Sequence, residues 1–140
     1  MKKRPNVTIK IMLRYKDEVL MIKHRDGSFG FPGGHMESGE SLIGTLKREL
    51  KEELNYNLKK EPKLFDIWNY IPEENPGENT KDHTVFLSYI LKLDKKPILF
   101  SPEKLGIFWL TREDIISKKI IKNKQFLDKI FKPLKIIRLS

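Results

Sequence analysis

The sequence predicts an α/β fold in which helices cover both faces of a mixed β-sheet, and two observations support this class. Strand-like segments with a two-residue apolar period lie on both sides of one long segment with helical periodicity. Two shorter helical segments follow the last strand candidate. With 140 residues the chain is long enough to bury a core of its own, so we expect residues 1–140 to form a single domain.

The N-terminal part predicts a pair of strands. Residues 7–14, VTIKIMLR, alternate apolar and polar positions as a strand does, and residues 19–23 predict the next strand. The polar residues 16–18 between them predict a hairpin turn. A polar loop, residues 23–28, then leads to a short extended piece at residues 29–32.

The middle of the chain combines a helix with two further strands. We expect a helix at residues 41–54 and strands at residues 64–71 and 83–93, the second being the longest and central to the sheet. The acidic stretch at residues 72–80 is rich in turn formers and predicts a long loop between these strands. Such a loop is either a cover for a substrate or an ordinary insertion.

The C-terminal part predicts one more strand and two helices. The strand is expected at residues 106–110, and Thr111 then begins a helix with acidic residues in its first turn. A second helix is expected at residues 123–131, and Pro133 ends it. The last residues, 134–140, predict a short strand or an irregular tail.

The predicted helix at residues 41–54 carries a cluster of acidic residues. Glu49, Glu52 and Glu53 stand at positions i, i+3 and i+4, so their carboxylates share one helix face. Glu53 falls on the apolar stripe of this helix, which consists of Leu42, Ile43, Leu46, Leu50 and Leu54. Because like charges crowded on one face repel, we expect a cation to hold them. The alternative is an ordinary solvated acidic face.

The composition of this segment favours a hard divalent cation. Gly33 and Gly34 precede the helix, and backbone can approach a ligand closely there because no Cβ intervenes. The clustered donors are carboxylate oxygens, and the chain has no cysteine. Donors of this kind suit Mg²⁺, with Mn²⁺ as the alternative.

The stretch Phe31–Tyr56, FPGGHMESGESLIGTLKRELKEELNY, resembles the Nudix box. In that pattern a glycine is followed after five residues by a glutamate, and after seven more by Arg-Glu-apolar-x-Glu-Glu-x-Gly-apolar. Gly34, Glu40 and Arg48 occupy the corresponding positions here. Asn55 replaces the glycine near the helix end, and asparagine tolerates the left-handed conformation of a helix cap. A match at so many fixed positions is specific.

The resemblance implies a Nudix-type α/β/α sandwich that hydrolyses a phosphoanhydride linked to a nucleoside or another group. It implies that Glu49, Glu52 and Glu53 hold one or more Mg²⁺ ions, and that Arg48, four residues before Glu52, orients the carboxylates. In the MutT-like branch a glutamate from the loop before the last strand approaches the metal site, and Glu103 is the candidate here; a surface position is the alternative. The general base is left open between Glu52, Glu53 and Glu103.

Other residues are candidates for binding the substrate. The backbone of Gly33–Gly34 would shape the passage of the phosphates, and Glu40 stands at the start of the predicted helix. Lys23 and Arg25 belong to a region that in the family often meets the base or the phosphates, with exposed loop charges as the alternative. His83 opens the strand at residues 83–93 and is either a pocket residue or a structural one.

The resemblance to MutT-type enzymes favours a nucleoside triphosphate, including oxidised forms such as 8-oxo-dGTP, as the small-molecule partner. ADP-ribose, dinucleoside polyphosphates and RNA 5′ ends are alternatives, and so is a catalytically silent domain that binds nucleotides or RNA. The net charge is +9, with Lys and Arg concentrated towards both ends of the chain, which attracts polyanions. The alternative is that this charge only serves solubility.

The composition also bears on location. The lack of cysteine excludes a disulfide framework and thiol chemistry, and it fits a reducing cytoplasm. No apolar run approaches the length of a membrane span, and no cleavage site follows the basic N-terminus. We therefore expect a cytoplasmic protein without a membrane partner.

Overall fold

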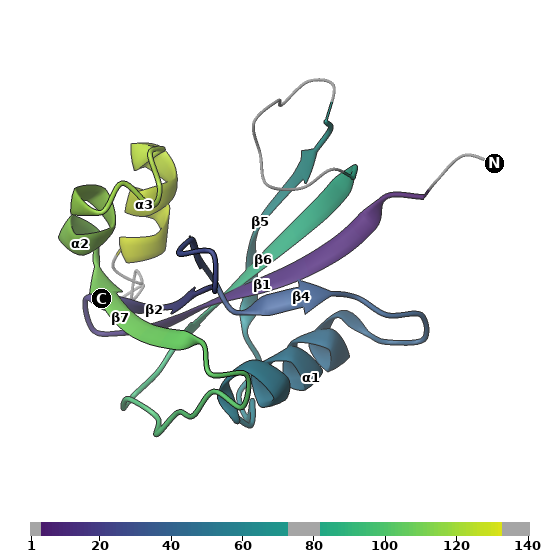
Figure 1. The fold of residues 1–140 in the computed structure, drawn as a ribbon, viewed down its shortest axis with the longest axis horizontal. Coiled ribbons are helices and arrows are strands. Elements are labelled where there is room, and N and C mark those ends of the chain that lie inside the picture. Colours follow the sequence, from purple (N-terminus) through teal and green to yellow (C-terminus); the bar gives the residue numbers. More distant parts are fainter. Residues whose placement is uncertain (1–3, 73–81, 133–140) are drawn as a thin grey trace, which may run out of the picture.

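The computed structural model describes residues 4–72 and 82–132, so the predicted acidic loop, apart from Pro72, and the C-terminal tail lie outside the described residues. The centre of the protein is a seven-stranded sheet (Figure 1). Its strands are β1 (Asn6–Tyr15), β2 (Glu18–Lys23), β3 (Phe29–Gly30), β4 (Gly33–His35), β5 (Lys63–Tyr70), β6 (Thr84–Lys92) and β7 (Gly106–Thr111).

The sheet is mixed, as predicted. Strands β1 and β6 run parallel, whereas the other pairings are antiparallel. The order is β3-β2-β1-β6-β5, with β4 beside β1 and β7 beside β2. The longest strand is β1, with ten residues, and not β6, with nine. Strand β6 is nevertheless internal, because β1 and β5 flank it.

Helices cover both faces of the sheet, which confirms the predicted sandwich. In Figure 1, α1 (Leu42–Leu54) lies on one side, and α2 (Arg112–Ser117) and α3 (Lys124–Phe131) lie on the other. Because side chains of a strand alternate, β1 contributes to both cores. Its residues Ile9, Ile11 and Leu13 share a core with Leu46, Leu50 and Leu54 of α1. Its residue Met12 shares the other core with Ile115, Leu127 and Ile130. No helix in the described part of the chain is long and apolar enough to span a membrane.

The glycine pair lies in a strand, which differs from the prediction. We expected one extended piece at residues 29–32 that ends in the glycine pair. Instead, Gly33 and Gly34 belong to β4, which pairs with β1. Gly33 has a φ of +137°, and a Cβ at this position would overlap the carbonyl group of Ile9. Only glycine allows the two backbones to approach so closely. Glycine has a low strand propensity, so the sequence did not predict a strand here.

Both ends of α1 follow the predicted local signals. Ser41 is the N-cap, and its side chain accepts a hydrogen bond from the N–H of Gly44 at 2.9 Å. Asn55 is the C-cap, with φ 53° and ψ 37° in the left-handed region. The N–H of Asn55 donates to the carbonyl of Lys51 at 3.1 Å. The predicted left-handed turn is therefore present with asparagine in place of glycine.

Replacing Asn55 tests this cap. The left-handed conformation costs most L-residues roughly 1–2 kcal/mol, so we expect Asn55→Ala to lower the free energy of unfolding by about 1 kcal/mol. Asn55→Gly should preserve or raise it. Urea unfolding followed by circular dichroism measures both changes. Asn57→Ala, at an exposed position just beyond the cap, is the matched control, and an equal loss in both alanine variants would contradict the role of the cap.

Candidate active site

The acidic helix meets the glycine strand through a direct hydrogen bond. The N–H of Gly33 donates to Oε1 of Glu53 at 2.9 Å. Glu53 is 8% exposed, so this carboxylate occupies a core position of α1, as its place on the apolar stripe predicted. A buried carboxylate needs such a donor, because loss of hydration disfavours an unpaired polar group.

The second glycine of β4 leaves room for another carboxylate. A Cβ built on Gly34 would lie 2.5 Å from the carboxyl carbon of Glu49. Oε1 of Glu49 also accepts a hydrogen bond from Nη1 of Arg48 at 2.8 Å. The missing side chain at Gly34 therefore creates the space that the carboxylate of Glu49 occupies beside the strand.

Arg48 links several elements around these carboxylates. Its Nε and Nη2 donate to the two oxygens of Glu40 at 2.7 and 3.1 Å, a bidentate pair. Nη2 also donates to the carbonyl of His35 in β4 at 2.9 Å. The contact with Glu52, which the four-residue spacing predicted, is longer, at 3.4 Å. Arg48 thus fixes α1 to the preceding loop and to β4.

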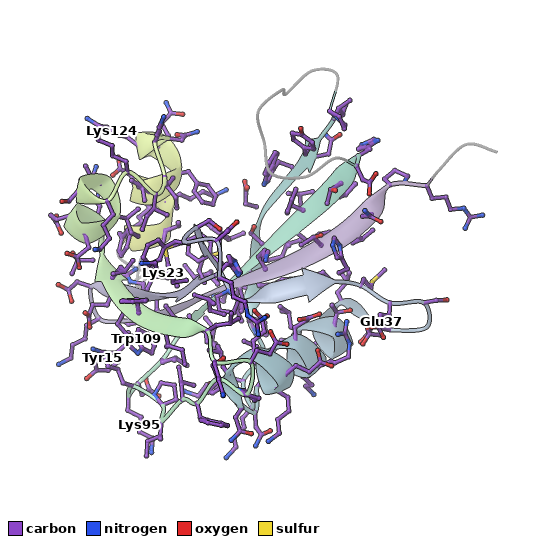
Figure 2. All side chains as sticks on the ribbon, viewed as in Figure 1. Tyr15, Lys23, Glu37, Lys95, Trp109 and Lys124 are labelled. Carbon is purple, nitrogen blue, oxygen red and sulfur yellow. The ribbon has the colours of Figure 1, made fainter. Side chains whose placement is uncertain are left out.

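Glu40 is held by hydrogen bonds from the surrounding protein. Its Oε1 accepts hydrogen bonds from the N–H of Glu37, labelled in Figure 2, at 2.9 Å and from the hydroxyl of Thr45 at 3.1 Å. The hydrogen bond from Arg48, followed by that from Glu37, lowers the pKa of Glu40 to about 2. The sequence analysis placed Glu40 among the substrate contacts, whereas the structure gives both its oxygens to protein donors.

Glu52 and Glu103 lie closer to solvent than Glu49 and Glu53. Burial raises the pKa of Glu49, and the charge of Glu52, whose side chain is 53% exposed, acts in the same direction. Glu103 is exposed in the turn before β7, yet close enough for its charge to raise the pKa of Glu53. The charges of Glu52 and Glu103 therefore act on the two more buried carboxylates.

The environment of Glu53 favours its protonated form. Burial raises the pKa of Glu53 to about 7, and the charges of Glu49 and Glu103 act in the same direction. The N–H of Gly33 and the ammonium of Lys10 oppose the shift. A carboxyl group with such a pKa can exchange a proton near neutral pH.

The donor set fits a hard divalent cation, although the carboxylates stand apart. Among residues 4–72 and 82–132, no three His, Asp or Glu side chains already converge as a metal site. The available donors are carboxylate oxygens, and the absent Cβ of Gly34 leaves Glu49 its space. A cation bound among these carboxylates would offset the repulsion between their charges.

Lys10 on β1 is a site residue that the sequence analysis did not identify. It is the register partner of Gly33, and its Nζ donates to the backbone carbonyl of Phe31 at 3.2 Å. Burial lowers the pKa of Lys10, and the charges of Glu53 and Glu49 oppose this shift. Lys10 thus supplies part of the positive charge that the crowded carboxylates require.

Lys10 also lines a pocket of about 240 Å³ between the sheet and the α2–α3 segment. Ser88, the register partner of Lys10 on β6, contributes a second polar side chain. The rings of Trp68 and Phe86 stack, with centroids 4.7 Å apart and 9° between their planes. The aromatic lining residues are Phe29, Phe31, Trp68, Phe86 and Phe126. Flat apolar surfaces therefore lie next to an ammonium group.

The remaining predicted substrate contacts are spread over the molecule. Lys23 ends β2 (Figure 2), and its Nζ lies 5.6 Å from the ring centroid of Phe29, in the pocket wall. Arg25 is exposed in the following loop. His83 is exposed before β6, with Nε2 3.0 Å from Oδ1 of Asn69. Along an extended strand, His83 lies roughly 16 Å from Ser88, so the structure does not bring it to the pocket.

These features coincide with a known domain family. The family model described as NUDIX domain matches residues 2–132. The chain belongs to the NUDIX domain family. The matched residues include both parts of this Nudix site, the carboxylates beside the glycine strand and the aromatic pocket beside Lys10.

Two curated relatives of this Nudix domain match over part of their length. The chain is 48% identical over 42 residues to a U8 snoRNA-decapping enzyme of Homalodisca vitripennis, which covers 30% of the chain and 22% of that protein. It is 27% identical over 92 residues to nucleoside triphosphatase NudI of Enterobacter sp. (strain 638), which covers 64% of the chain and 65% of that protein. The chain spans less than two thirds of either relative.

A solved MutT structure has the same fold as this Nudix domain. It comes from a study of MutT from Aliivibrio salmonicida and Vibrio cholerae, with a TM-score of 0.69 and 17% sequence identity. The match covers 92% of this chain and 98% of that chain. At this identity the likeness establishes the fold, and it confirms the predicted Nudix-type sandwich.

Sequence signals for the missed parts of the Nudix site were weak. Lys10 interrupts an otherwise apolar run, but an alternating strand accepts a lysine at an exposed position without special meaning. Trp68 and Phe86 are paired only because β5 and β6 are antiparallel neighbours. The aromatic residues of the predicted strand at residues 64–71 were the sequence feature closest to the pocket, but the sequence did not indicate which residues their rings would contact.

The raised pKa of Glu53 predicts that the metal-free protein becomes less stable as the pH rises towards 7. The folded state keeps the proton on Glu53 up to about pH 7, whereas the unfolded chain releases it near the ordinary value of 4.5. Because the folded state then binds more protons, the free energy of unfolding falls as pH rises between these values, by on the order of 2 kcal/mol.

Urea unfolding at pH 5 and pH 7, with a chelator present, measures this slope. Glu53→Gln should remove most of it, since glutamine cannot titrate. The lowered pKa of Glu40 acts at more acidic pH and leaves this window unaffected. A slope that persists unchanged in Glu53→Gln would assign the effect to another group.

Proposed function

We propose that this chain acts as a single, cytoplasmic Nudix domain that hydrolyses a nucleoside triphosphate in a MutT-type reaction and releases pyrophosphate. The observation that carries the proposal is the position of Glu53, buried against the glycine strand with Glu49 beside it and with the aromatic pocket adjacent. Carboxylates that gather next to a pocket with flat walls suit a substrate made of a phosphate chain and a base.

The residues of the chain divide the chemistry among them. Glu49, Glu52 and Glu53 would hold Mg²⁺ or Mn²⁺, and Arg48 would keep Glu49 and Glu52 in place. When bound, the cation would neutralise charge on the phosphate oxygens and make the attacking water more acidic. Water adds to phosphorus, the bond to the bridging oxygen breaks, and pyrophosphate leaves. The water proton passes to Glu52, Glu53 or Glu103.

The pocket supports a nucleoside as the group attached to the phosphates. A planar base stacks favourably on aromatic side chains. Trp68 remains 42% exposed, so part of its surface is open to a ligand. Lys10 and Ser88 offer polar groups beside the rings. Oxidised bases such as that of 8-oxo-dGTP meet the same requirements.

An RNA 5′ end is the second candidate substrate, because the excess of Lys and Arg near both ends of the chain favours a polyanion. The name of the decapping relative from Homalodisca vitripennis points in the same direction. ADP-ribose and dinucleoside polyphosphates carry the same kind of bond. A silent nucleotide- or RNA-binding domain would not require the full carboxylate set, which is present here.

A hydrolysis screen tests the proposal. The substrates are nucleoside triphosphates including 8-oxo-dGTP, ADP-ribose, dinucleoside polyphosphates and triphosphorylated RNA, with Mg²⁺ or Mn²⁺, and phosphate and pyrophosphate are measured separately. We expect pyrophosphate from a triphosphate, and a loss of at least about 10²-fold in Glu53→Gln. Glu61→Gln, at an exposed position before β5, is the matched control and should retain activity. Silence over the whole panel from folded protein would overturn the proposal.

Gly34→Ala tests the cation site without removing a carboxylate. Its φ lies outside the left-handed region, so the fold should tolerate alanine, but the new Cβ would displace the carboxylate of Glu49. We expect millimolar Mg²⁺ to raise the melting temperature of the wild type, as ligand linkage requires, and to raise that of Gly34→Ala clearly less. Differential scanning fluorimetry measures both. Equal shifts in the two proteins would argue against cation binding at Glu49.

A further inference from the structure

The amino group of Lys10 lies at the boundary between the two parts of the site. Its strand partner on one side is Gly33, whose N–H binds Glu53, and its partner on the other side is Ser88, which lines the pocket. Glu49 and Glu52 of α1 make direct ion pairs with Arg48. The charges of Glu53 and Glu49 act on Lys10, whose ammonium group donates a hydrogen bond to the carbonyl of Phe31.

We propose that Lys10 binds the substrate directly, by donating hydrogen bonds to the phosphate group nearest the nucleoside. This inference rests on the proposed function, because it requires a phosphate chain that runs from the pocket to the carboxylates. A phosphate in that position would lie beside the Gly33–Gly34 backbone and within the neighbourhood of Lys10.

The donor capacity of Lys10 suits this role. An ammonium group has three N–H donors and no acceptor, and the carbonyl of Phe31 uses one of the three. Among the residues that the structure describes, no second partner takes the other two donors, which can therefore bind a ligand. A partly buried cation gains most from an anionic partner, because its hydration has been reduced. Negative charge that arrives with the phosphate also favours the ammonium form.

The same residue fits a phosphate better than the edge of a base. Lysine is a compact point charge without the planar geometry that arginine uses for bidentate recognition. Two carboxylates, Glu49 and Glu53, already act on its charge, so the ammonium belongs to the charged half of the site rather than to the apolar half. If Lys10 contacts a phosphate, replacing it should lower kcat/KM by the same factor whichever base the pocket holds.

Lys10→Met tests the proposal, because methionine keeps an unbranched chain and removes the charge. We expect kcat/KM to fall by about 10²-fold, and by the same factor for guanine, adenine and pyrimidine nucleotides. Lys10→Arg, which keeps a cation, should restore part of the loss. Lys92→Met, at the exposed end of β6, is the matched control and should leave kcat/KM unchanged.

Binding provides a readout that does not require turnover. Calorimetry with a non-hydrolysable α,β-methylene nucleotide should show weaker binding by Lys10→Met, whereas competition by the free nucleoside, which has no phosphate, should be unchanged. If the wild type hydrolyses nothing, the proposed function fails, and this binding comparison still decides the role of Lys10.

Three results would overturn the inference. One is an unchanged kcat/KM in folded Lys10→Met. Another is a loss restricted to bases that carry a carbonyl group, which would place the contact at the base. The third is a loss of Mg²⁺-induced thermal stabilisation with unchanged nucleotide binding, which would leave Lys10 only a structural role beside Glu53.

Discussion

The site depends on the close contact of β4 with β1, which only glycine permits. A side chain at Gly33 would overlap the carbonyl group of Ile9, and one at Gly34 would meet Glu49. Because both positions lack a Cβ, the glycine strand can run in the sheet and still offer an N–H to Glu53 of α1. A core position of the helix can therefore hold a carboxylate, at the expense of an apolar contact that leucine would have made there.

The same segment places carboxylates in two opposed environments. Glu40 accepts a bidentate pair from Arg48 and further protein donors, and its pKa falls to about 2. Glu53 is buried, accepts a hydrogen bond from the N–H of Gly33 and feels the charges of Glu49 and Glu103, and its pKa rises to about 7. The first carboxylate is permanently charged and suits a structural role, whereas the second can respond to a cation or to a proton. Environment rather than residue type divides their roles.

Short sequence patterns predicted the helix ends, which depend on residues close together in the chain. The extent of α1 and its left-handed cap at Asn55 follow from residues a few positions apart, and the structure has both as expected. The capped start of α2 at Thr111 follows the same rule. The pairing of β4 with β1 and the position of Lys10 were not predictable in this way. They depend on which strands become neighbours, and β1 pairs with β6, which lies far along the chain.

This division explains why the Nudix box indicates the type of reaction more readily than the identity of the substrate. The box residues are contiguous, and their spacing alone fixes the carboxylates on α1 against β4. The pocket is assembled from β1, β2, β3, β5, β6 and the α2–α3 segment, so its walls can change without altering the carboxylates. Lys10 belongs to both parts, since β1 carries it between the partner of Gly33 and the partner of Ser88. A charge at this junction would act on the phosphates and on the carboxylates together, so in the proposed site β1, which lies outside the Nudix box, would connect substrate binding to chemistry.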